Sequence, residues 1–245
     1  MAWATLGDNL KFSTSNSATA PSPQLLAARL WRLVLSRKSI KLTEAIQTYL
    51  KTVKHLCPHV ESDALSFLES GLTISTLSDK HFYIQANTIQ NNVGFVFSGL
   101  LRAFYIDDVG NEITVRFVKE NDFATNYVSF ISQQPSRYYF QCIEPCEIVN
   151  ISYQYMQEAF SKFPSLEKYG RLIAEEILKG QQKRIESFLF DNAEKRYLDF
   201  INGNPNLFNR VSISYLSSYL GIDRRSLTRI RKKLAYHSFW DICLR

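Results

Sequence analysis

The sequence lacks the features by which membrane proteins, disulfide-linked domains and zinc proteins are recognised. No run of about eighteen uncharged apolar residues occurs, so no membrane-spanning helix is expected. The four cysteines, Cys57, Cys142, Cys146 and Cys243, form no Cys-x-x-Cys pair, and no histidine stands at zinc-ligand spacing from them. We therefore expect reduced thiols, no bound metal and a cytoplasmic location.

Signatures of an enzyme are missing as well. The four histidines, His55, His59, His81 and His237, belong to no recognisable motif, and Pro58 breaks the helix that would pair the first two. The sequence contains neither a Walker A loop nor a Gly-x-Ser-x-Gly motif. We predict no catalytic residue, and therefore a protein that is not an enzyme.

The composition of the chain is typical of a globular protein, but its N-terminal segment differs from the rest. The chain has 245 residues, of which 45% are hydrophobic, and a net charge of +6. Residues 1–40 are poor in acids, because Asp8 is the only one, and Ser13–Pro23 is small and polar. We predict a tail without function. It also faintly resembles an organelle transit peptide, and a true start near Lys41 is a further alternative.

The apolar pattern then changes along the chain. Helical spacing runs from Leu42 to Leu68, with a second short helix over Glu61–Ser70. Runs with a period of two follow: His81–Gln85, Val93–Ser98, Leu100–Tyr105, Glu112–Val118, Tyr138–Cys142 and Glu147–Ser152. Short strands at regular spacing predict a β sandwich or barrel over about residues 72–152.

Helical spacing returns after Tyr153. One short helix is expected to end near Pro164, and a longer one to cover Ser165–Phe190, with an apolar stripe of Leu166, Tyr169, Ile173 and Ile177. The stripe either packs on the β block of the same chain or meets a partner helix. Asp191 is predicted to cap a helix over Ala193–Asn202.

The segment Leu216–Lys233 has the pattern of a helix-turn-helix. Gly221 supplies the turn, where the backbone needs a positive φ. The buried set is Leu216, Leu220, Ile222, Leu227 and Ile230. Ser217 is the small residue that lets the two helices approach, and Asp223 can cap the second one.

The second helix carries six basic residues and no acid over Arg224–Lys233. Ordinary solvated faces mix both signs, so this run favours a polyanionic partner. Residues near the helix N-terminus are predicted to read base edges: Arg224, Arg225, Thr228 and Arg229. Residues predicted to bind phosphates are Ser212, Ser214, Arg231, Lys232 and Lys233.

The order of these parts resembles the Crp/Fnr family of bacterial regulators. Phe97–Tyr105 followed by Gly110-Asn111-Glu112 is similar to the family's sensor hairpin, and Asn121-Asp122-Phe123 to its next loop. Ala193–Leu198 resembles the first helix of its DNA-binding domain. Ser218–Ile222 with Leu227–Leu234 resembles its reading head. The resemblance covers about residues 45–235.

The resemblance implies an α+β fold with an N-terminal cyclic-nucleotide-binding-like antiparallel β-roll, a long dimerisation helix and a C-terminal helix-turn-helix domain. The expected division is a tail (1–40), a sensor (41–164), a dimerisation helix (165–190) and a DNA-binding domain (191–245). It implies a homodimer on a palindromic operator, with an interface at Leu166, Tyr169, Ile173, Ile177 and Gly180. Double-stranded DNA is the main expected partner, and RNA polymerase is a further candidate.

One departure from the family concerns the effector. Members that bind cyclic AMP carry a Gly-Glu pair, then an Arg followed by a small residue. Here the matching stretch is Phe123–Tyr127, which has neither the Gly nor the Glu, and Arg137 is followed by Tyr138. We therefore expect no response to cyclic AMP and no cofactor, with Thr125, Asn126 and Arg137 as a candidate pocket for an unknown effector.

A different class of function stays open beside this one. The chain could be a small-molecule sensor or a protein-interaction module whose helix-turn-helix is vestigial. The basic second helix argues against that alternative.

Overall fold

The computed structural model describes residues 42–243, with side chains described for residues 42–234. The predicted tail, residues 1–40, lies outside the described residues. Residues 42–56 are helical, and α2 spans Ser62–Ser70. Ala45, Tyr49 and Val53 recur every fourth residue and are buried, so this helix contributes one apolar side to the core.

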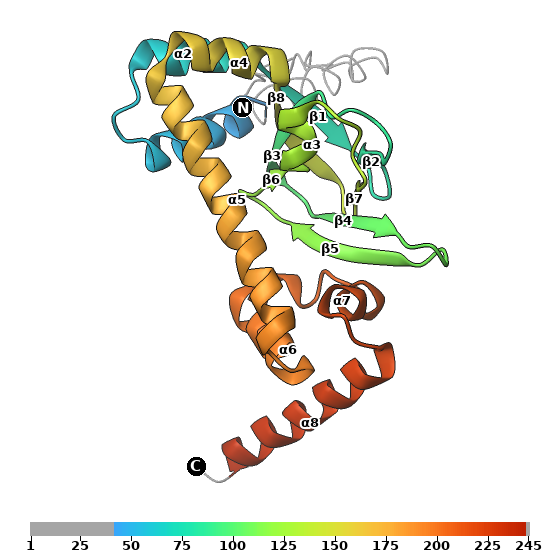
Figure 1. The fold of residues 1–245 in the computed structure, drawn as a ribbon. Helices are drawn as coiled ribbons and strands as arrows, with labels where there is room; N and C mark the ends of the chain where they lie inside the picture. The colour runs from blue at the N-terminus through green and yellow to red at the C-terminus, as the bar shows by residue number, and fades with distance from the viewer. Residues whose placement is uncertain (1–41, 244–245) are drawn as a thin grey trace, which may run out of the picture. The chain divides into compact units, whose positions relative to one another are not determined.

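Two antiparallel four-stranded sheets follow (Figure 1). The first has the order β1 (Leu72–Leu77), β8 (Cys146–Ser152), β3 (Asn92–Ser98) and β6 (Phe123–Ala124). The second has the order β2 (Phe82–Ile84), β7 (Tyr139–Cys142), β4 (Leu101–Ile106) and β5 (Glu112–Val118). Val96 and Ile148 of the first sheet share a buried cluster with Leu101 and Phe140 of the second. The two sheets therefore enclose a common core, which makes them a β-roll.

Three helices pack against the β-roll or extend away from it. They are α3 (Tyr127–Ser132), α4 (Tyr153–Lys162) and α5 (Pro164–Phe190). Ser152 caps α4 by accepting a hydrogen bond from the Tyr155 N–H at 3.2 Å. Pro164 starts α5, where its fixed φ suits a helix and its missing N–H is not needed.

The C-terminal part consists of α6 (Ala193–Gly203), the short 3₁₀ helix η1 (Pro205–Leu207), α7 (Ile213–Leu220) and α8 (Arg224–Cys243). The cap of α6 differs from the predicted one. Asn192 accepts the Lys195 N–H at 2.9 Å, while Asp191 ends α5 and pairs with the Lys195 ammonium. The residue directly before the first helical turn makes the cap, and that residue is Asn192.

The fold is α+β, with an antiparallel β-roll, a long helix and C-terminal helices. The strand over Glu112–Val118 has its predicted bounds, and the other five predicted strands agree to within one residue. The sequence did not predict β1, β6 or α3. In the described part of the chain, no helix is both long and apolar enough to cross a membrane.

Candidate nucleic-acid interface

The turn between α7 and α8 is built around Gly221. Its φ of 64° and ψ of 40° lie in the left-handed region, which glycine adopts without a steric penalty. A Cβ at this position would also lie 2.6 Å from Phe188 Cε1. The conformation of the turn therefore requires glycine, and a larger residue would also displace the Phe188 ring.

Buried apolar side chains hold the two helices together. Leu216, Leu220 and Leu227 are at most 2% exposed. Ser217, also buried, donates its hydroxyl to the Ser214 carbonyl at 3.0 Å, so its small polar side chain is satisfied inside the packed face. The pair forms one rigid unit around a common core.

Asp223 caps the N-terminus of α8. Its carboxylate accepts the Ser226 N–H at 2.8 Å and the Ser226 hydroxyl at 2.6 Å. These hydrogen bonds from Ser226 lower the pKa of Asp223 from its usual value of 3.8, so the cap is ionised at neutral pH. The first turn of α8 is thereby fixed next to the predicted base-reading residues.

The four predicted base-reading residues, Arg224, Arg225, Thr228 and Arg229, are all exposed. Thr228 donates its hydroxyl to the Arg224 carbonyl at 2.8 Å. Within residues 42–234, none of the three arginine side chains makes a hydrogen bond or an ion pair. These guanidinium groups are thus free to meet an external acceptor.

The predicted phosphate-binding residues differ from one another in their exposure and in the contacts that they already make. Ser212 is exposed and caps α7 by accepting the Tyr215 N–H at 3.2 Å, and Lys232 is exposed. Arg231 stacks 4.6 Å from the centre of the Phe208 ring, and the Lys233 ammonium lies 2.8 Å from the Glu194 carboxylate. Arg231 and Lys233 therefore already have partners inside this domain.

The remaining predicted phosphate-binding residue, Ser214, is half-buried in α7. Its carbonyl accepts the Ser217 hydroxyl.

Sequence reasoning missed a contact between α7 and the β4–β5 hairpin. The Arg102 side chain is 1% exposed and lies between two rings, with Cζ 4.0 Å from the centre of Phe104 and 3.9 Å from that of Tyr215. It forms an ion pair with Glu112. Tyr215 belongs to α7, so a cation from the β-roll is stacked against the helix-turn-helix.

Ser218 adds a backbone connection at the same place. Its hydroxyl donates to the Glu112 carbonyl at 3.0 Å and accepts the Thr114 N–H at 2.9 Å. Thr114 is 1% exposed, although its polar side chain lies on the face of β5 opposite to that of Ile113 and Val115. That face is covered because α7 packs on it. We refer to Arg102, Glu112, Tyr215 and Ser218 as the α7 dock.

Arg210, which precedes α7, forms a second ionic connection. Its guanidinium lies 2.7 Å from both the Glu120 and the Glu144 carboxylates. Burial raises the pKa of Glu120, but the hydrogen bonds and the charge of Arg210, together with backbone hydrogen bonds, outweigh it, so the pKa lies below the usual 4.5. The same two carboxylates raise the pKa of Arg210. Glu120 and Arg210 are therefore both charged at neutral pH.

The candidate effector residues Thr125 and Asn126 are engaged by neighbouring side chains. Gln90 donates to the Thr125 hydroxyl at 3.1 Å and accepts the Asn126 N–H at 3.1 Å. The Asn126 amide donates to Ser136 Oγ at 3.1 Å, and Ser136 is fully buried. Arg137 is exposed and makes no side-chain hydrogen bond among the described residues. The structure thus brings Thr125 and Asn126 together without Arg137.

The predicted stripe on α5 lies on its own β-roll. Leu166 and Tyr169 are 1% and 6% exposed and belong to the core cluster, against which Ile173 also packs. A partner helix therefore has no access to Leu166 and Tyr169. The large apolar side chains that α5 leaves exposed are Leu178, Ile185, Phe188, Leu189 and Phe190.

Comparison with known sequences identifies one part of the chain. Residues 76–163, which run from the end of β1 to the end of α4, match the family model of the cyclic nucleotide-binding domain. No curated protein sequence matches the chain.

Solved structures with a similar fold include three with a TM-score above 0.5. The c-di-GMP responsive global regulator CLP of Xanthomonas campestris has 16% identity and a TM-score of 0.58, over 73% of this chain and 93% of its own. FixK2 of Bradyrhizobium japonicum has 15% identity and a TM-score of 0.60, over 68% and 86%. A CooA mutant of Carboxydothermus hydrogenoformans has 17% identity and a TM-score of 0.56, over 69% and 78%. At such low sequence identities, the similarity shows only that the folds are alike.

Proposed function

We propose that the protein is a DNA-binding transcription regulator of the Crp/Fnr type, which binds a palindromic operator as a homodimer. The observation that carries this proposal is a set of exposed arginines at the N-terminus of α8 that have no ion-pair or side-chain hydrogen-bond partner within residues 42–234: Arg224, Arg225 and Arg229. A recognition helix enters the major groove at this end, and arginine binds the O6 and N7 atoms of guanine with two hydrogen bonds.

The proposed division of labour follows from what each basic side chain already contacts. Lys232 is exposed and meets phosphate, which has no sequence information. Lys233 is held by Glu194 and contributes less to DNA binding than its sequence position implies. The sensor covers residues 41–164, the dimerisation helix 165–190 and the DNA-binding domain 191–245.

Replacing Arg225 by alanine is expected to weaken binding to the operator by about 10–100-fold, since a bidentate base contact contributes roughly 1–3 kcal/mol. The operator is first obtained by selecting bound duplexes from a random pool with the wild-type protein. Fluorescence anisotropy at several salt concentrations then gives Kd for the selected and for random DNA.

Lys233→Ala is the matched control, because its ammonium is occupied by Glu194. We expect it to change Kd by less than about twofold, whereas Lys232→Ala reduces the salt slope by about 1. Equal weakening of selected and random DNA by Arg225→Ala would show that Arg225 does not read a base. If the pool yields no enriched sequence, the alternative of a vestigial helix-turn-helix is favoured.

An exposed apolar stripe on α5 supports the homodimer. Leu178, Ile185 and Leu189 are 65%, 56% and 69% exposed. Ile185 follows Leu178 by seven residues and Leu189 follows Ile185 by four, so the three side chains share one side of the helix. Exposed apolar residues in such a row are typical of a helix that packs against another. We therefore propose this row, rather than Leu166 and Tyr169, as the partner-facing stripe.

The regulator is proposed not to respond to cyclic AMP. Gln90 and Ser136 occupy the polar groups of Thr125 and Asn126, and the cassette has no carboxylate for a ribose hydroxyl. Cyclic AMP at millimolar concentration is expected to leave the melting temperature unchanged. A ligand at 100 times its Kd adds about 2.7 kcal/mol, which is easily measured. A clear upward shift that AMP does not produce would contradict this prediction.

A further inference from the structure

Two arginines from different helices converge on the C-terminal end of α7. Arg184 of α5 donates from Nη2 to the Tyr219 carbonyl at 2.6 Å. Arg196 of α6 donates from Nε to the Leu220 carbonyl at 3.0 Å. The last carbonyls of a helix have no partner within the helix, so cations next to them are favourable. These two carbonyls directly precede Gly221, so both arginines act at the turn from which the proposed recognition helix begins.

Phe188 of α5 contacts both guanidinium groups. The centre of its ring lies 4.7 Å from Arg184 Cζ and 5.1 Å from Arg196 Cζ, within the range of a cation–π contact. Arg184 also stacks on the Tyr219 ring at 3.8 Å. The Phe188 ring reaches the turn as well, since a Cβ on Gly221 would lie 2.6 Å from Phe188 Cε1. We refer to Arg184, Phe188 and Arg196 as the arginine clamp.

The arginine clamp brings two positive charges together without an acid. Within residues 42–234, neither Arg184 nor Arg196 forms an ion pair. Burial lowers the pKa of Arg184, and the charge of Arg196 lowers it further. A neutral residue at either position would avoid this repulsion. Stability alone therefore does not explain the pair, whereas a guanidinium group offers several donors in one plane, which suits a rigid joint between helices.

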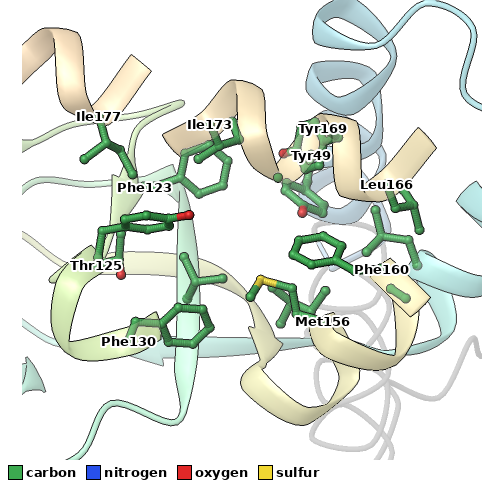
Figure 2. Close-up of a pocket in the computed structure, with 16 residues that line it drawn as sticks. Tyr49, Phe123, Thr125, Phe130, Met156, Phe160, Leu166, Tyr169, Ile173 and Ile177 are labelled. Carbon is green, nitrogen blue, oxygen red and sulfur yellow. The ribbon is translucent and has the colours of Figure 1, made fainter. Parts of the chain in front are cut away.

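The arginine clamp lies far along α5 from the part of this helix that the β-roll holds. Leu166, Tyr169 and Ile173, all within the first ten residues of α5, pack on the core of the roll (Figure 2). Arg184 and Phe188 belong to the last seven residues of α5. The arginine clamp therefore joins the end of α5 to the start of α8. In a dimer whose α5 helices meet at the two-fold axis, this joint fixes the distance and the angle of each α8 relative to that axis.

We propose that the arginine clamp is a positioning device that sets the spacing of the two half-sites which the dimer accepts. The inference rests on the proposed homodimer and deepens it by assigning the operator spacing to named residues. Recognition helices enter successive major grooves on one face of the duplex when they lie about 34 Å apart. One base pair more or less shifts the half-sites by about 3.4 Å and turns them by about 35°. A rigid joint therefore accepts one spacing, and a loose joint accepts several.

The test measures how affinity depends on operator spacing. Full-length protein is titrated by fluorescence anisotropy against duplexes that carry the selected half-sites, with the spacer unchanged or altered by one or two base pairs, and against a single half-site. The wild type is expected to lose at least about tenfold in affinity when the spacer changes by one base pair, because both half-sites can no longer be bound together. Arg184→Met/Arg196→Met is expected to lose less than about threefold, and to bind the single half-site as the wild type does.

Lys183→Met/Lys195→Met is the matched control, because it removes two positive charges from exposed neighbouring positions of the same two helices. This control is expected to keep the spacing preference of the wild type. Arg184→Lys/Arg196→Lys retains the charges without the planar donors and is expected to restore the preference only in part.

Three results would overturn the inference. If Arg184→Met/Arg196→Met keeps the wild-type spacing preference, the arginine clamp does not set the spacing, although the homodimer stands. If this variant also loses the single half-site, the arginine clamp maintains the fold of the domain rather than its position. If the wild type binds one half-site as tightly as any pair, the homodimer itself is wrong, and the inference fails with it.

Discussion

Replacing Leu178 and Ile185 of α5 with glutamate is expected to give a folded monomer that has lost most of its operator affinity. Both side chains are more than half exposed, so their replacement removes little packing within the chain. In a dimer, however, the two carboxylates would be buried without a partner charge, which is strongly unfavourable. Light scattering with a thermal unfolding curve distinguishes a folded monomer from an unfolded chain.

The loss of DNA affinity follows from the geometry of a two-fold operator. Two helix-turn-helix units related by a two-fold axis read half-sites about 34 Å apart. Linking two sites raises affinity by about 10²–10⁴ over one, because the second contact forms at a high effective concentration. We therefore expect at least about a hundredfold weaker binding to the selected operator, and a protected region reduced to one half-site.

Gly180→Glu is the matched control for this double variant. Gly180 lies on the opposite side of α5 from Leu178 and Ile185, and a Cβ there would meet no atom within 4 Å. It also belongs to the dimer interface that the family resemblance implies. If Gly180→Glu dissociates the dimer and the Leu178/Ile185 variant does not, the interface lies on that side. A wild-type monomer that protects a single, non-palindromic half-site would contradict the homodimer itself.

The helix-turn-helix illustrates how much of the fold could be predicted from the sequence. Its turn needs a glycine, its second helix needs a capping residue such as aspartate, and its core needs leucines at a fixed spacing. Each of these requirements involves residues that are close together in the sequence. The structure has Gly221 at φ 64°, Asp223 on the Ser226 N–H and Leu227 fully buried. The strand over Glu112–Val118 could be predicted equally well, because apolar and polar residues alternate through most of its seven residues.

Short elements and long-range contacts could not be predicted in this way. Helix α3 has six residues and β6 has two, which is too few for a period to be recognised. On α5, the spacing of Leu166 and Tyr169 correctly indicates an apolar side, but it does not say whether the same chain or a partner covers it. The sequence pattern does not predict the stacking of Arg102, because only the fold brings this residue between Phe104 and Tyr215.

Arg102→Ala is expected to destabilise the protein by about 3 kcal/mol. The substitution opens a cavity between the Phe104 and Tyr215 rings, removes two cation–π contacts and leaves Glu112 without its partner. Because the Glu112 side chain is 47% exposed, its charge stays partly hydrated. Most of the loss therefore comes from packing and stacking, measured as the free energy of unfolding in urea.

Arg171→Ala provides the control for removing an arginine that forms an ion pair. Arg171 pairs with Glu175 on the surface of α5 and is 60% exposed, so its loss is expected to change stability by less than about 0.5 kcal/mol. Arg102→Lys keeps the charge but not the flat guanidinium, and we expect it to recover only part of the loss.

Hydrogen exchange decides whether Arg102 acts as part of the α7 dock or only stabilises the β4–β5 hairpin. If the α7 dock holds the helix-turn-helix on the β-roll, Arg102→Ala must increase exchange at the Thr114 N–H, which donates to Ser218 Oγ, and at the amides of α7. The β1–β8 pair, on the other sheet, reports the loss of global stability, so exchange at Thr114 and in α7 must increase by more than exchange there. Faster exchange confined to β4 and β5 away from Thr114, with α7 unchanged, would show that the helix-turn-helix is held without Arg102. Arg210 and its two carboxylates would then have to account for the contact between the two parts.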